Sequence, residues 1–132
     1  MNIEELEKSF ENACSNMDMK EMVKKAVIYA EACHQERKYD LAISCLKKLL
    51  PRSDKDKRYK AIVLTALGTA YWEKAQLKKA LTQFEEALQL FRELGDKAGK
   101  AAVLFIVGVT YWRKCEWDRA LQILENALNL KT

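Results

Sequence analysis

The chain repeats itself at a spacing of 40 residues. When residues 61–90 are aligned with residues 101–130, 13 of the 30 positions are identical. The shared residues are mostly alanine, leucine and aromatic residues, and they recur at helical spacings. A repeat of this length, built from residues that favour helices, predicts helix pairs that must stack to bury their apolar faces. We therefore expect an all-α fold and a function based on surface recognition.

Helix start and stop signals divide the chain into about seven helices. Pro51 ends one helix because it has no backbone N–H, and Ser53 is the expected N-cap of the next, with Asp56 in a capping-box position. Gly95 is a natural C-cap, and Asp96 can cap the helix that follows. The expected helices cover residues 3–16, 19–35, 39–50, 54–74, 77–94, 97–114 and 117–130, and the first has an apolar stripe of Ile3, Leu6, Phe10, Ala13 and Met17.

Charge and cysteine content limit the possible classes of protein. The net charge is +4 but uneven, with six acids and two bases in residues 1–21 and seven bases and two acids in residues 47–60. Charge runs of this size are typical of solvated surface. The start of the chain lacks a signal-peptide pattern, and no apolar run is long enough to cross a membrane. The four cysteines have no disulfide-framework spacing, so we expect reduced, mostly buried thiols in the cytoplasm.

Residues at fixed offsets resemble the tetratricopeptide repeat family. The clearest copy has Leu64, Leu67, Gly68, Tyr71, Ala80, Phe84 and Ala87, the next has Leu104, Val107, Gly108, Tyr111, Ala120, Leu124 and Ala127, and a weaker copy has Ala26, Tyr29, Ala30, Cys33, Ala42, Leu46 and Leu49. The resemblance implies a right-handed superhelical solenoid of antiparallel helix pairs. It makes residues 1–132 one domain, with a half repeat or capping helix at 1–18 and repeats at 20–51, 53–94 and 96–130.

The repeats also depart from the usual pattern of that family. Their spacings are 38 and 40 residues, longer than the usual 34. The glycine often found between the two helices of a repeat is replaced by Arg37, Ala75 and Cys115. We expect these changes to alter the pitch of the superhelix and to leave the fold class unchanged.

The resemblance further implies a concave groove lined by the first helix of each pair. Its expected residues are Val27, Glu31, His34, Ile62, Thr65, Thr69, Trp72, Phe105, Val109 and Trp112. Two interpretations of Trp72 and Trp112 stay open, because they can be groove anchors or can complete the core. The basic clamp with which some members bind acidic chaperone tails is missing, since its positions hold Val27, Glu31, Ala66, Ala102 and Ile106. The groove is therefore expected to prefer an apolar or amphipathic segment.

Catalytic chemistry finds little support in the sequence. His34 is the only histidine, no nucleophile motif accompanies it, and the four glycines form no phosphate-binding loop. The spacing of the cysteines does not suit zinc. We expect no catalytic residue, metal or cofactor, and interpret the chain as a non-enzymatic scaffold or adaptor that binds a protein or peptide.

Two alternative functions stay open. The last helix carries Leu121, Leu124 and Leu128, although repeat arrays usually end with a polar-faced helix. This face can be covered by a continuation of a longer array or by a second copy in a homodimer. The basic run at residues 47–60 can instead bind nucleic acid, but its two aspartates and few aromatic residues disfavour that reading.

Overall fold

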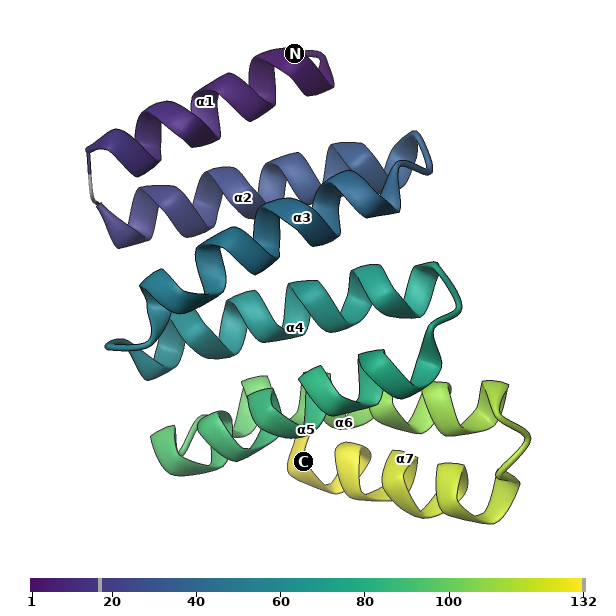
Figure 1. Ribbon diagram of the computed structural model, residues 1–132. Coiled ribbons are helices and arrows are strands. Elements are labelled where there is room, and N and C mark those ends of the chain that lie inside the picture. Colours follow the sequence, from purple (N-terminus) through teal and green to yellow (C-terminus); the bar gives the residue numbers. More distant parts are fainter. Residues whose placement is uncertain (17, 132) are drawn as a thin grey trace.

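The computed structural model describes residues 1–16 and 18–131, and these residues form one row of stacked helices (Figure 1). The described α-helices are α1 (Ile3–Ser15), α2 (Met19–Gln35), α3 (Tyr39–Leu49), α4 (Lys57–Glu73), α5 (Leu77–Leu94), α6 (Lys97–Arg113) and α7 (Trp117–Lys131). Successive helices are antiparallel, and the row runs from α1 to α7. The expectation of seven helices in an all-α fold is confirmed. Met17 of the predicted stripe and the side chain of Leu130 lie outside the described residues.

Short polar side chains cap the N-termini of α1, α2, α4 and α6, whereas α3 and α5 begin without a side-chain cap. The Asp96 carboxylate accepts a hydrogen bond from the Gly99 N–H at 2.9 Å and caps α6, as predicted. Gly95 ends α5 in the left-handed conformation with φ of 68°, also as predicted. Asn2 and Asp18 cap α1 and α2 in the same way as Asp96. Each cap satisfies backbone N–H groups that have no partner inside the helix.

The start of α4 differs from the prediction. Its N-cap is Asp56, whose carboxylate accepts hydrogen bonds from the N–H groups of Arg58 and Tyr59 at 3.0 and 3.2 Å. Ser53 instead ends a short 3₁₀ helix, η1 (Leu50–Ser53), and its buried hydroxyl donates to the Leu50 carbonyl at 2.6 Å. The prediction that Ser53 caps α4 was wrong, because its hydroxyl instead donates to the carbonyl of Leu50, the residue at the end of α3.

The three links inside the helix pairs share one backbone conformation. Arg37, Ala75 and Cys115 have φ values of 59°, 64° and 64°, in the left-handed region. In each link, the N–H of the following residue bonds to a carbonyl five residues earlier, such as Gln76 to Tyr71 at 2.9 Å. This is the Schellman helix ending, which usually carries glycine at the left-handed position. The links therefore keep a glycine conformation without glycine.

Close contacts between the two helices of a pair set the core. A Cβ added to Gly68 would lie 2.6 Å from the fully buried Phe84 ring, and one added to Gly108 would lie 2.7 Å from the Leu124 side chain. Ala80 and Ala120, which recur in the repeat pattern, are both fully buried. The repeated small residues thus let the paired helices pack at short range.

The cysteines only partly follow the prediction. All four are free thiols, and Cys33 and Cys45 are buried. Cys115 is exposed because it lies in the left-handed link after α6. The expectation that most of the thiols are buried holds only for Cys33 and Cys45, because Cys14 is half-buried.

Candidate functional site

The expected groove residues lie on α2, α4 and α6, the first helices of the three pairs. A hollow of about 300 Å³ opens between α2 and α4. Its walls are mostly apolar, with four ionisable side chains, and are made by Val27, Ala30, Glu31, His34, Tyr39, Ala42, Ala66, Thr69, Ala70 and Glu73. Four of the ten expected groove residues, Val27, Glu31, His34 and Thr69, are thus brought together in one hollow.

A contact between His34 and Glu73 joins the two helices at one side of this hollow. The Nδ1 of His34 is paired with the carboxylate of Glu73, whose side chain is largely buried. Burial raises the pKa of Glu73, and the charge and hydrogen bond of His34 oppose that rise. A carboxylate in a mostly apolar wall costs free energy unless a positive group lies beside it. His34 lies in this position beside Glu73.

Two threonines on α4 contribute little hydrogen-bonding capacity. The Thr65 hydroxyl donates to the Ala61 carbonyl and the Thr69 hydroxyl donates to the Thr65 carbonyl, both at 2.8 Å. Because each hydroxyl hydrogen is used inside its own helix, these residues present mainly methyl groups and acceptor lone pairs.

Trp72 is half-buried and covered on one side by the next repeat. The Arg113 guanidinium lies 4.5 Å from the centre of the Trp72 ring and donates to the Trp72 carbonyl at 2.9 Å. The indole Nε1–H is buried and has no acceptor among the described residues. Trp72 thus packs against the core cluster on one side and against the Arg113 guanidinium on the other. Less of its surface is exposed than a groove anchor requires.

Phe105 and Trp112 lie at the other end of the predicted groove, on the last helix pair. Trp112 is half exposed and meets Trp117 in an edge-to-face contact with ring centres 4.7 Å apart. Phe105 lines a second hollow of about 290 Å³ with Leu124, Ala127 and Leu128. The structure therefore groups these two predicted groove residues with α7. Ile62 on α4 and Val109 on α6 are half-buried and line neither hollow.

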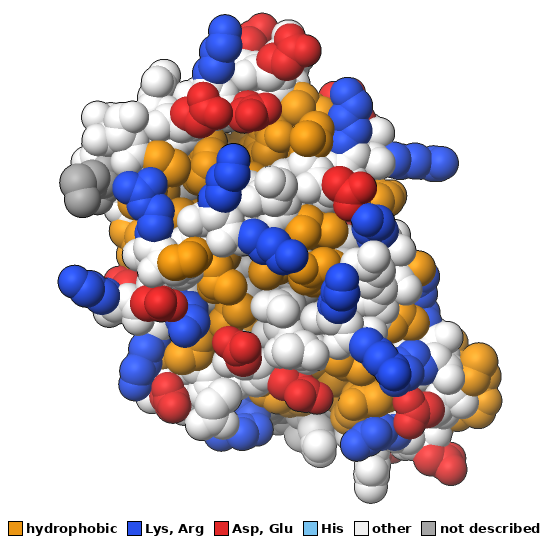
Figure 2. Space-filling view, viewed as in Figure 1, with side chains coloured by type: hydrophobic (Ala, Val, Ile, Leu, Met, Phe, Trp, Pro, Cys, Tyr) orange, Lys and Arg blue, Asp and Glu red, His pale blue; other side chains and the backbone are white. Residues whose placement is uncertain are grey.

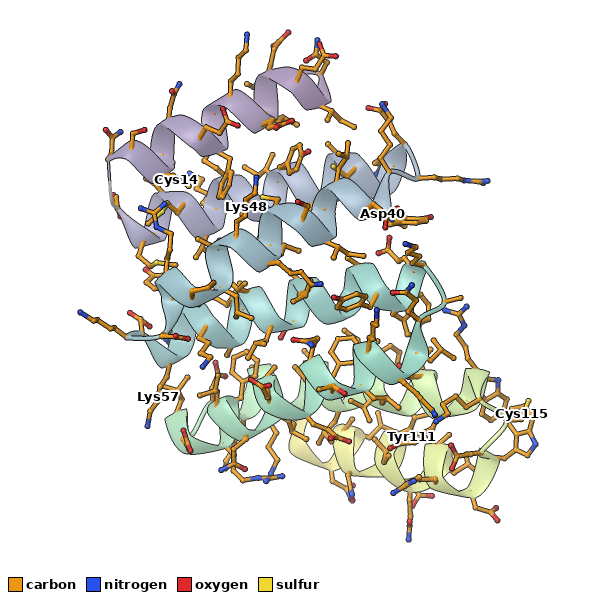
Figure 3. All side chains as sticks on the ribbon, in the orientation of Figure 1. Cys14, Asp40, Lys48, Lys57, Tyr111 and Cys115 are labelled. Atoms are coloured by element: carbon orange, nitrogen blue, oxygen red, sulfur yellow. The ribbon has the colours of Figure 1, made fainter. Side chains whose placement is uncertain are left out.

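A third hollow was not anticipated from the sequence. It measures about 250 Å³ and lies between α1 and α3, where Figure 3 shows Cys14 and Lys48 on facing helices. Phe10, Tyr29, Leu49 and Cys45 supply its apolar floor, and burial raises the pKa of the Cys45 thiol to about 12. Its residues come from separate repeats and share no motif, so no sequence pattern could have located it.

The basic run is interspersed with acids in the folded chain. Lys57 pairs with Glu93 at 3.4 Å, Arg58 with Asp96 at 3.4 Å, and Lys60 with Asp54 at 3.2 Å. Figure 2 shows blue and red side chains mixed over this face. A nucleic-acid site requires a continuous basic surface, which these pairs interrupt.

The part of the chain that the structure describes contains neither a cluster of metal-ligating side chains nor a membrane-spanning helix. Within residues 1–16 and 18–131, histidine, cysteine and acidic side chains form no group of three that could ligate a metal ion. Over the same residues, each helix is too short or too polar to span a bilayer.

Comparisons with known proteins identify the repeats. A family model of the tetratricopeptide repeat matches residues 22–93 and again residues 59–132. The crystal structure of BtubC (BKLC) from P. vanneervenii is similar in fold, with a TM-score of 0.84 at 19% sequence identity. The alignment covers 98% of this chain and 55% of that chain, so the chain spans about half the length of that protein. No curated protein matches the sequence.

Proposed function

Because this chain belongs to the tetratricopeptide repeat family, whose domains generally mediate protein interactions, we propose that it is a non-enzymatic scaffold or adaptor. In this proposal it binds an apolar or amphipathic segment of a partner protein in the groove formed by α2, α4 and α6. The observation that carries the proposal is the hollow between α2 and α4, because it contains four of the expected groove residues. The four free thiols are compatible with a cytoplasmic location.

The chemistry of this hollow narrows the kind of segment that fits it. Val27, Ala30, Ala66 and Ala70 offer an apolar surface large enough for one or two side chains. Glu31 is exposed, and the Glu73 carboxylate is largely buried in the same hollow. An arginine or lysine next to an apolar residue would bury its aliphatic stem against the alanines and place its charge near the two carboxylates.

Filling the hollow tests the proposal. Thr69 lines the hollow on α4, whereas Thr82 is exposed on α5 and lines none of the hollows described above. Each can be replaced by tryptophan, and the two variants serve as a matched pair. Proteins captured from native lysate by the immobilised chain are then compared by mass spectrometry, after far-UV circular dichroism has established equal helicity.

We expect Thr82→Trp to capture the same proteins as the parent chain and Thr69→Trp to lose at least one of them. A captured protein that is lost should be recovered by crosslinking to α2 or α4 of the parent chain. If Thr69→Trp captures the same proteins in the same amounts, the hollow between α2 and α4 is not the binding site.

A further inference from the structure

The hollow between α1 and α3 has acidic side chains on one side and basic side chains on the other. Glu7 and Glu11 line it from α1, four positions apart, while Lys48 lines it from α3 and Arg52 from η1. In the upper part of Figure 2, red and blue side chains lie on opposite sides of a strip of hydrophobic side chains. We call this hollow the α1–α3 furrow.

The two charged sides of the furrow do not neutralise each other. Among the described residues, Glu7, Glu11 and Lys48 form no salt bridge. Arg52 donates to the Cys14 carbonyl at 3.2 Å, and its guanidinium has further N–H donors. Opposite charges attract each other across a short gap, so the lack of pairing indicates that the furrow holds them apart. Both sides are therefore able to pair with charges of a partner.

In the next two repeats, the space between second helices is covered by cations of the chain itself. Lys79 of α5 lies 5.7 Å from the centre of the Tyr71 ring, and Lys47 of α3 lies 5.8 Å from the same centre. One repeat later, Arg119 of α7 lies 4.7 Å from the centre of the Tyr111 ring. Each of these repeats thus covers its tyrosine with a cation from its second helix, at the same repeat position.

The first repeat departs from this pattern. The positions that correspond to Tyr71 and Lys79, 38 residues earlier, hold Cys33 and Leu41. Cys33 is buried, whereas Leu41 is 42% exposed and lines the furrow. In the part of the chain that the structure describes, no cation lies over the Tyr29 ring of its floor. An apolar side chain therefore stands at an open furrow where the other repeats place a covering cation.

The size of the furrow and its acidic side decide which kind of partner fits. Its volume of about 250 Å³ is below the roughly 300–1,000 Å³ of pockets that enclose a small molecule, so it suits a few side chains of a protein segment. Nucleic acids and anionic membranes are disfavoured, because Glu7 and Glu11 would repel their phosphates. The same two carboxylates lie one turn apart on α1, which is the spacing of side chains at positions i and i+4 of a second helix.

We propose that the α1–α3 furrow binds an amphipathic α-helix of a partner protein. The apolar side chains of that helix contact Leu41 and the floor of the furrow. Basic side chains on one flank pair with Glu7 and Glu11, and acidic side chains on the other flank face the basic side. The furrow shares no lining residue with the hollow between α2 and α4, so this inference goes beyond the function proposed above and can fail separately.

Three designed peptides serve as probes. Each is a helix of about 18 residues, long enough to be partly helical in water, with the same ridge of leucines. The mixed peptide has lysines on one flank of the ridge and glutamates on the other, the second has lysines on both flanks, and the third has glutamates on both. All three are labelled with fluorescein and titrated with the full chain, and binding is followed by fluorescence anisotropy.

The repeat supplies a matched pair of substitutions that fill the furrow or leave it open. Ser44 is exposed on α3 and lines the furrow, whereas Thr82 holds the corresponding position on α5 and lines none of the hollows described above. The mixed peptide should bind the parent chain saturably and most tightly of the three. Ser44→Trp should weaken this binding at least about ten-fold, because the indole takes the space of a buried apolar side chain. Thr82→Trp and Thr69→Trp should leave it unchanged.

A charge reversal tests the two flanks. Lys48→Glu places an acid on the basic side of the furrow, so it should weaken binding of the mixed peptide and strengthen binding of the lysine-only peptide, each about three- to five-fold. Lys78→Glu changes the net charge equally at an exposed position of α5 and should leave the order of the three affinities unchanged. Far-UV circular dichroism checks that every variant keeps the helicity of the parent chain.

Three results would overturn the proposal. Equal or tighter binding of a peptide with two identical flanks to the parent chain would remove the role of the two charged sides. Equal binding by Ser44→Trp and Thr82→Trp would place the peptide outside the furrow, and a loss confined to Thr69→Trp would place it in the hollow between α2 and α4. Absence of saturable binding for all three peptides would remove the helix site.

Discussion

The two helix-pair glycines should respond very differently to the same substitution. A Cβ at Gly68 would lie 2.6 and 2.8 Å from two carbons of the Phe84 ring. Phe84 is fully buried and lines none of the hollows described above. A Cβ at Gly108 would lie 2.7 Å from the side chain of Leu124, but Leu124 borders the hollow beside Phe105 and can move into it. The sequence contexts are alike, so the difference is purely one of packing.

Two opposing contributions to the free energy of unfolding set the size of each effect. Replacing glycine by alanine inside a helix stabilises the fold by about 1 kcal/mol. Overpacking a filled core costs roughly 1–3 kcal/mol, and a rigid, fully buried ring places Gly68 near the upper end. We therefore expect Gly68→Ala to lower the free energy of unfolding by about 1–2 kcal/mol, a fall in Tm of roughly 3–8 °C at this chain length. Gly108→Ala should change it by less than about 0.5 kcal/mol, because the two terms nearly cancel.

Urea and thermal unfolding followed by far-UV circular dichroism measure both variants. A double variant adds a second test, since Phe84→Leu places at this site the residue that faces Gly108 in the next repeat. Gly68→Ala should cost less in the Phe84→Leu background than alone, with a coupling energy of about 1 kcal/mol. Equal effects of the two glycine substitutions, or an increase in stability for Gly68→Ala, would refute the packing argument.

Three further predictions concern individual side chains. Ala75→Gly should raise the free energy of unfolding by about 0.5–1 kcal/mol, because relief of a left-handed non-glycine residue outweighs the added freedom of the unfolded chain; an unchanged or lower Tm would contradict it. Burial raises the pKa of Glu73 in the folded chain, so ionisation at higher pH disfavours folding. The stability of Glu73→Gln relative to the parent should therefore be greater at pH 7 than at pH 3.5 in urea unfolding, and a constant difference would argue against this. The exposed Cys115 should react rapidly with a thiol reagent at pH 8, whereas Cys45, with its pKa near 12, should react only after unfolding.

Local signals were sufficient for most helix boundaries. The caps at Asp96 and Gly95 act over three or four residues, and they were predicted because their chemistry is contained in the neighbouring sequence. Ser53 was misassigned because two competing polar residues lie three positions apart, and only the local backbone decides which one caps α4. The glycine-like links at Arg37, Ala75 and Cys115 were located correctly, but their left-handed conformation was visible only in the structure.

The candidate site was less predictable. The groove positions of α2 and α4 followed from the repeat pattern, and four of them share one hollow. The pairing of His34 with Glu73 and of Trp72 with Arg113 joins residues 39 and 41 positions apart. Contacts over such distances depend on the angle at which one helix pair stacks on the next, which no local pattern encodes.

The sequence by itself determined the repeat, the helices and the family, because periodic apolar residues and caps act within single helices. It could not distinguish Trp72 from Trp112, which follow the same tyrosine in the same repeat position. Tertiary structure decided that difference, because exposure depends on what packs against a residue from outside its own repeat. Arg113 covers the first tryptophan, and the second is half exposed.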